Sequence, residues 1–312
     1  MDKPPPPRAA LIVHAGAWAI PSAEKKAHAE GCARAAEAGW AVLKDGGKAI
    51  DAVRAAICSM GDDRNLNAGA GSVLTRAGHI ETDAGLMNGT TLDSGGVAAI
   101  RDRANPIEAA NCVLESKYVL LVGQGAMQFL DGEGFPKVDP ESLIEQRERD
   151  RLQEALQRPT DEGHDFMDAA VTGPGDTVGA VAIDKIGRIA AGASTGGICG
   201  KPPGRMGDTP VPGAGYYADD LLAGAACTGW GEPLLRMGMA RRAVELAREN
   251  NAMDATWLAI QEFDKRYQGR GGVILIGRDG SIGYSFNTPS MATAFMDEEM
   301  TTPHVGGIAA DD

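Results

Sequence analysis

The sequence predicts a single α+β domain, and three observations lead to that prediction. Stretches with the apolar spacing of helices alternate along the chain with short apolar runs typical of strands. The 42 glycines are too many for a helical protein of 312 residues and match a fold of short strands, bends and close backbone approaches. Distinctive motifs are interleaved from His14 to Met291, so we expect residues 1–312 to form one domain.

The first half of the chain is expected to contain three strands and three helices. Short apolar runs predict strands at residues 10–14, 72–75 and 79–87. Helical spacing predicts helices at residues 23–44, 48–60 and 106–115. Asp51 lies in the first turn of the second helix, where a carboxylate favours the helix dipole, and Pro106 opens the third in the tolerated first-turn position.

A charged segment separates the two halves. Residues 140–161 combine many acidic and basic side chains, and residues 159–175 are rich in Gly, Pro and Asp. The composition predicts a solvated helix followed by a mobile linker, together spanning residues 140–175.

The second half is expected to begin with two apolar strands around a tight turn, within residues 178–189. Helices are predicted at 232–250 and 253–267. A hairpin follows at residues 273–286, and Asp279-Gly280 in its turn is typical of tight connections.

Composition excludes several kinds of function. A net charge of −13 disfavours a nucleic-acid partner. The five cysteines contain no Cys-x-x-Cys pair, so neither a zinc knuckle nor a disulfide framework is indicated. Residues 1–10 are Pro-rich without the apolar stretch of a signal peptide, and no segment is long enough to span a bilayer. A cytoplasmic protein without a membrane partner is therefore expected.

Thr177 is the candidate nucleophile. It opens the run Thr-Val-Gly-Ala-Val-Ala-Ile-Asp directly after Asp176. If the chain cleaves itself between Asp176 and Thr177, the new α-amine titrates at about 7.7 to 8.0 and acts as the base that a hydroxyl nucleophile requires. Thr177 would then supply both nucleophile and base from an accessible strand end, at the open edge of a sheet.

Further polar residues follow within the next fifty-odd positions of the sequence. Thr195 is expected to hydrogen-bond Thr177 and tune it, and Thr228 lies in a Gly-rich bend suited to stabilising an oxyanion. Arg205 and Asp208 lie three residues apart among glycines. An arginine that binds a carboxylate and an aspartate that binds an ammonium group suit a free amino acid as ligand.

These residues belong to a series of motifs in a recognisable order, which together cover nearly the whole chain. They occupy residues 13–18, 66–74, 83–89, 177–184, 194–197, 204–208, 213–219, 228–232, 271–274 and 287–291. In this order and spacing the chain closely resembles the plant-type L-asparaginase/isoaspartyl peptidase family. The resemblance implies a four-layer αββα sandwich, the N-terminal nucleophile hydrolase fold.

The resemblance implies cleavage into residues 1–176 (α subunit) and 177–312 (β subunit), and a homodimer of αβ units. It assigns residue roles as follows: nucleophile, Thr177; hydroxyl partner, Thr195; oxyanion hole, Thr228 and Gly229; neighbour of the new N-terminus, Asn67; α-carboxylate ligand, Arg205; α-amine ligands, Asp208 and the backbone near Gly231. The implied reaction passes through a β-aspartyl ester. L-Asparagine and β-aspartyl dipeptides share the group that is recognised, and their order of preference stays open.

Family members carry a sodium or potassium ion in a loop that maps onto residues 60–70. The backbone carbonyls implied as ligands belong to Met60, Gly61, Asp63, Leu66, Ala68 and Ala70. Met60-Gly61 replaces the usual Leu-Glu and Leu66 the usual Phe, so the identity of the ion stays open. No cofactor is implied for catalysis.

Two alternatives stay open. Aspartate before the cut, as at Asp176, is typical of the related glycosylasparaginases, whereas Gly196-Gly197 and residues 228–232 favour the isoaspartyl branch. The second alternative is a relative that does not process itself and retains the fold for binding alone.

Overall fold

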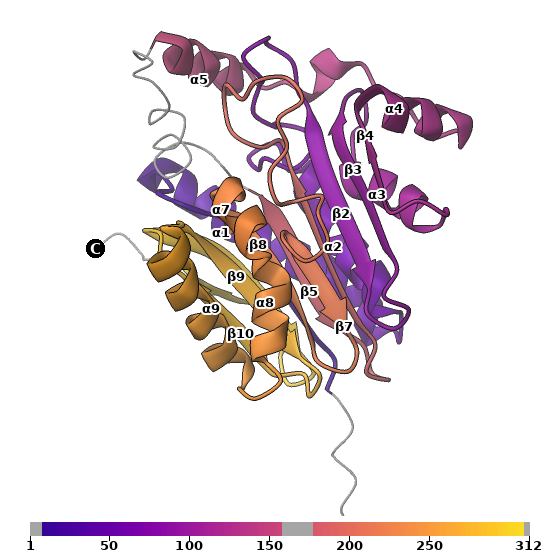
Figure 1. The fold of residues 1–312 in the computed structure, drawn as a ribbon, viewed down its shortest axis with the longest axis vertical. Helices are drawn as coiled ribbons and strands as arrows, with labels where there is room; N and C mark the ends of the chain where they lie inside the picture. The colour runs from indigo at the N-terminus through magenta and orange to yellow at the C-terminus, as the bar shows by residue number, and fades with distance from the viewer. Residues whose placement is uncertain (1–7, 158–176, 309–312) are drawn as a thin grey trace, which may run out of the picture.

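The computed structural model describes residues 8–157 and 177–308, which form four layers (Figure 1). Two β-sheets stack face to face, and helices cover the outer face of each sheet. The expected α+β sandwich of type αββα is therefore confirmed.

The larger sheet has eight strands. In spatial order they are β12 (His304–Gly306), β11 (Ser290–Asp297), β1 (Ala10–Trp18), β5 (Val178–Ile183), β6 (Ile189–Thr195), β2 (Thr82–Asn88), β3 (Ser94–Ile100) and β4 (Leu120–Val122). The smaller sheet runs β10 (Ile282–Phe286), β9 (Gly271–Gly277), β8 (Ala223–Gly229) and β7 (Tyr216–Asp219). All neighbours are antiparallel except β3 and β4, which are parallel.

Helices from the two halves of the chain lie on opposite outer faces of the sandwich. The first half contributes α1 (Ser22–Lys44), α2 (Ala49–Asp62), α3 (Pro106–Leu114), α4 (Gly123–Gly132), the 3-10 turn η1 (Pro140–Leu143) and α5 (Gln146–Gln157). The second half contributes α7 (Gly231–Met237), α8 (Met239–Leu246) and α9 (Ala252–Tyr267). In Figure 1 α8 and α9 lie over the small sheet, and α1 and α2 lie behind the large one.

Side-chain alternation along the strands produces three apolar interfaces between the four layers: helices against the large sheet, the large sheet against the small sheet, and the small sheet against its helices. On β5, Val178 and Ala180 face the helices α1 and α2, whereas Val181 and Ile183 face the small sheet. Because successive residues of a strand point to opposite faces, a buried central strand must be apolar on both sides, which explains its unbroken apolar sequence.

Most predicted elements are confirmed, and two are wrong. Residues 72–75 form no strand but one isolated bridge, Leu74 to Ile80. The helix predicted at 232–250 is divided at Gly238, which adopts a left-handed conformation (φ 65°, ψ 50°) between α7 and α8. Helical apolar spacing continues across Gly238, so periodicity alone did not reveal the break.

Part of the charged segment before Thr177 lies within the described residues. Its helix exists as α5, but it is not solvated on all sides, because Glu148 and Leu152 are buried. Arg151 links the buried Glu148 to Glu24 of α1. The remainder of the predicted linker, residues 158–175, lies outside the described residues.

Candidate active site

Thr177 directly precedes β5 and is only 6% exposed. Strand β5 pairs with β1 on one side and β6 on the other, so the expectation that Thr177 lies at an open sheet edge is wrong. The residue occupies the end of a central strand instead. Asp176, on the other side of the expected cut, lies outside the described residues.

Strand pairing places Thr195 beside Thr177. In the antiparallel pair of β5 and β6, Gly179 is opposite Ala193 and Val178 is opposite Ser194. Continuing that register by one residue puts Thr177 opposite Thr195, and directly opposite residues project from the same face. That face is the one that meets the small sheet, because Val181 and Ile183 share its parity.

Thr228 approaches from the small sheet. A Cβ added to Gly179 would be 3.0 Å from Cβ of Ala226, and one added to Gly224 would be 2.8 Å from Val181. These two contacts show that β5 and β8 run in opposite directions across the layer. Thr177 lies two residues before Gly179, and Thr228 lies two residues after Ala226. The same antiparallel arrangement therefore places Thr177 and Thr228 at the same end of the sandwich.

The hydroxyl of Thr177 contacts the hydroxyl of Thr209. Their Oγ1 atoms lie 3.4 Å apart, and Thr209 is 1% exposed. The hydroxyl of Thr195 instead accepts a hydrogen bond from the Gly197 N–H at 2.9 Å, so the expected bond from Thr195 to Thr177 is not the one observed. Sequence reasoning overlooked Thr209, although this hydroxyl directly follows Asp208.

Asn67 supports the turn after Thr195. Its Nδ2 donates to the Gly197 carbonyl at 2.8 Å, and its Oδ1 accepts from the N–H groups of Gly196 and Val73 at 3.1 Å each. A Cβ on Gly196 would lie 2.2 Å from Oδ1 of Asn67, so only glycine fits there. The described hydrogen bonds of Asn67 thus hold this turn, and a contact with the new N-terminus stays a prediction.

Arg205, Asp208 and Gly231 meet in one place, as the sequence predicts. A Cβ on Gly231 would be 3.1 Å from both Nη2 of Arg205 and Oδ1 of Asp208. Glycine at this position therefore leaves room beside a guanidinium and a carboxylate.

Arg205 already has a carboxylate partner that sequence reasoning did not identify. Its Nε donates to Glu232 at 3.0 Å, and its Nη2 contacts both oxygens of Glu232 at 2.9 Å. These bonds hold the guanidinium in place. Nη1 takes no part in them and lies near Gly207, where an added Cβ would be 3.3 Å from Nη1.

Asp208 and Thr228 are buried and lack hydrogen-bond partners for one atom each. Within the described part of the chain, Oδ2 of Asp208 and Oγ1 of Thr228 have no hydrogen-bond partner. Burial raises the pKa of Asp208 to about 7, although the nearby Arg205 opposes this shift. Buried polar atoms normally find partners, so both point to groups that a ligand would satisfy.

His14 is a poor candidate for a general base. It is fully buried beside the backbone of Thr177, and this burial lowers its pKa to about 3. A Cβ on Gly179 would lie 2.3 Å from its Nε2. This packing indicates a structural role for His14.

The segment expected to hold an alkali ion, residues 60–70, begins in the last turn of α2 and brings backbone carbonyls together. A Cβ on Gly69 would be 2.6 Å from the Gly61 carbonyl oxygen, and one on Gly61 would be 3.6 Å from that of Ala68. Carbonyl oxygens suit hard cations. The Gly61 and Asp63 carbonyls accept hydrogen bonds from Ala70 and Leu66, and the Ala68 carbonyl accepts one from Ser194, so each keeps one lone pair. The ion stays a prediction.

Comparison with known proteins gives a consistent result. A family model described as Asparaginase matches residues 7–305. A plant-type L-asparaginase of Pyrococcus abyssi is 39% identical over 305 residues, covering 95% of this chain and 99% of the relative. Isoaspartyl peptidase/L-asparaginases of Bos taurus and Mus musculus are 36% and 38% identical, covering 91% and 93% of this chain and 92% and 90% of the relatives.

Proposed function

This chain belongs to the asparaginase family, and on that premise we propose that it is a self-cleaving threonine hydrolase acting on L-asparagine and β-aspartyl dipeptides. One observation carries the proposal. Strand register and layer packing bring Thr177, Thr195 and Thr228 to the same end of the sandwich, and Arg205 and Asp208 lie beside Gly231, where their charges suit an α-carboxylate and an α-amine.

The reaction follows from the groups present. After cleavage, the free α-amine of Thr177 takes the proton of Oγ1, and the oxygen attacks the side-chain carbonyl carbon of the substrate. Thr228 and Gly229 stabilise the oxyanion. The C–N bond breaks, ammonia or the amine of the peptide leaves with the proton, and water then hydrolyses the β-aspartyl ester.

Substrate binding uses the two charged groups that the fold preorganises. Glu232 holds the Nε and Nη2 side of Arg205, so the α-carboxylate of the substrate binds from Nη1. Oδ2 of Asp208 takes the α-ammonium group beside Gly231. Both ligand groups are common to asparagine and β-aspartyl peptides, so one pocket serves both substrates.

The test is mass spectrometry of the purified protein combined with two assays. We expect two fragments that meet between Asp176 and Thr177, ammonia from L-asparagine and aspartate from a β-aspartyl dipeptide. A single mass of 32.4 kDa after long incubation, without either product, would favour the non-processing alternative. Release of aspartate only from N-glycosylated asparagine would favour the glycosylasparaginase branch.

The assembly and the ion are proposals that the same sample tests. The resemblance leads us to propose a homodimer of αβ units with a sodium or potassium ion in the loop of residues 60–70. The large apolar side chains Tyr118, Val119 and Val122, exposed at and next to the edge strand β4, support an interface there. Native mass spectrometry measures both the oligomeric state and the bound ion. A monomer without a retained alkali ion would refute both proposals.

The pH dependence of kcat/KM is expected to contain the titration of Asp208. The carboxylate must be ionised to bind an ammonium group, and its pKa is raised to about 7. The α-amine of Thr177 must also lose its proton, with an ordinary pKa of about 7.7 to 8.0. Below both values, log(kcat/KM) should therefore rise with a slope of about two per pH unit.

Asp208→Asn separates the two titrations. It should lower kcat/KM most at and above about pH 7, where Asp208 is ionised in the wild type, and reduce the slope at lower pH to about one, because only the α-amine still titrates. The difference between variant and wild type should therefore shrink as the pH falls. An unchanged slope would remove Asp208 from the binding step.

A further inference from the structure

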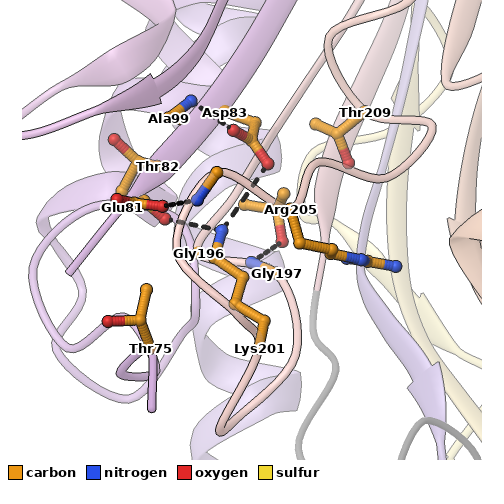
Figure 2. Close-up of polar contacts among 12 residues, drawn as sticks. Thr75, Glu81, Thr82, Asp83, Ala99, Gly196, Gly197, Lys201, Arg205 and Thr209 are labelled. Atoms are coloured by element: carbon orange, nitrogen blue, oxygen red, sulfur yellow. Dashed lines mark hydrogen bonds and ion pairs between the residues drawn. The ribbon is translucent and has the colours of Figure 1, made fainter. Parts of the chain in front are cut away.

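Lys201 is a buried cation in the loop between Thr195 and Arg205. Its side chain is fully buried, and its Nζ donates to the Glu81 carbonyl at 2.9 Å. The Nζ also lies 3.8 Å from Oδ2 of Asp83, which is equally buried (Figure 2). The other oxygen of Asp83 accepts from the Ala99 N–H at 2.7 Å. None of these groups was singled out for a role from the sequence.

Burying such a pair is costly. Removing two charges from water costs several kcal/mol each, and their attraction often fails to compensate. Burial raises the pKa of Asp83 and lowers that of Lys201, while their mutual attraction opposes both shifts. A pair of this kind is weak evidence for stability, and its contacts point to another use.

The first of these contacts is with the turn that holds Thr195. Gly197 adopts a positive φ of 82°, and a Cβ there would lie 2.9 Å from Nζ of Lys201. The N–H of Gly197 donates to Oγ1 of Thr195 at 2.9 Å. Asp83 is the direct partner of Thr195 in the pairing of β2 with β6. The ion pair therefore lies against both the backbone and the strand neighbour of Thr195.

The second contact is at the other end of the loop. The Glu81 carboxylate, 3% exposed, accepts from the Gly204 N–H at 2.7 Å, and Gly204 directly precedes Arg205. Figure 2 shows Glu81 and Asp83 on one side of the loop, with Lys201 reaching back to them and Arg205 beyond it. Residues next to β2 and on it thus hold the loop at its middle and at its end.

We propose that Lys201, together with Asp83 and Glu81, is a positioning device that fixes the spacing between Thr195 and the carboxylate-binding Arg205. The inference rests on the proposed function of that site. Lys201 touches neither substrate nor nucleophile, and it acts through the loop of residues 196–204. Its loss is expected to affect the reaction step through Thr195 and substrate binding through Arg205.

Lys201→Met removes the charge and keeps most of the volume. We expect kcat/KM for L-asparagine to fall at least about tenfold, with a lower kcat and a higher KM. The reason is that a small displacement of the groups at an active site lowers the reaction rate steeply. Amide hydrogen exchange in residues 196–204 should accelerate. Arg103→Met is the matched control, because Arg103 is equally buried but pairs with Asp102 and Asp131. It should leave both readouts unchanged.

The outcomes separate this inference from the proposed function. Wild-type kinetics and exchange rates in Lys201→Met would overturn the inference. If Lys201→Met does not fold, Asp83→Asn, which keeps the side-chain volume, is read in the same way. An inactive wild-type protein would count against the proposed function, whereas faster exchange confined to residues 196–204 in the variant would still support the positioning role.

Discussion

A Thr177→Ala chain is expected to remain one polypeptide of 32.4 kDa and to release no ammonia from L-asparagine. The substitution removes the hydroxyl that attacks during both self-cleavage and turnover. Because the nucleophile has no substitute at the end of β5, we expect a loss of at least about 10⁴-fold in kcat. Intact mass spectrometry and ammonia release measure the two effects on the same sample.

Two controls define the meaning of that result. Thr177→Ser keeps a hydroxyl and should still cleave, more slowly, because serine lacks the β-methyl that restricts χ1. Thr256→Ala removes another fully buried threonine, on α9, whose hydroxyl bonds to Met253 and Ser285. It should cleave normally. Cleavage or hydrolysis by Thr177→Ala would exclude Thr177 as the nucleophile.

Arg205→Ala is expected to reduce kcat/KM by about 10²- to 10³-fold, chiefly through KM. Truncating one partner of a buried, hydrogen-bonded charge pair typically costs 2–5 kcal/mol, of which part is the penalty of an unpaired partner. Here that partner is Glu232, which would then repel the carboxylate of the substrate. Steady-state kinetics with L-asparagine and a β-aspartyl dipeptide measure the effect. We expect kcat/KM to fall by a similar factor for both substrates.

Three further variants separate charge from geometry. Arg205→Lys keeps the charge without the planar fork and should recover only part of the loss. Glu232→Gln keeps the shape and leaves Arg205 in place, so a small effect is expected. Arg242→Ala breaks an ion pair with Glu262 between α8 and α9 and should leave the kinetics unchanged. Unchanged kinetics in Arg205→Ala would remove Arg205 from the site.

The order of motifs was enough to predict the layered fold and to propose the residues of the site. Arg205 and Asp208 are three residues apart, so a short loop was bound to keep them close. Thr177 directly precedes β5 and Thr195 ends β6, and a tight turn joins these two strands, so antiparallel pairing places the two threonines opposite one another. These predictions therefore depended only on the chemical type of each residue and on short connections along the chain.

Other features depend on contacts between distant parts of the chain. Thr209 reaches Thr177, Glu232 orients Arg205, and the β2 region supports Lys201 over more than a hundred residues of sequence. Gly85 leaves room for Tyr216, because a Cβ at Gly85 would be 2.0 Å from the ring of Tyr216.

The sequence by itself determined which residues we propose for the chemistry, because a nucleophile and its ligands must be of particular types in a particular order. Only the tertiary structure decided which hydroxyl touches Thr177 and which carboxylate holds Arg205. Hydrogen bonds and ion pairs require approach within about 3 to 4 Å. Strand register and layer packing set such distances, and neither can be read from residues that are far apart along the chain.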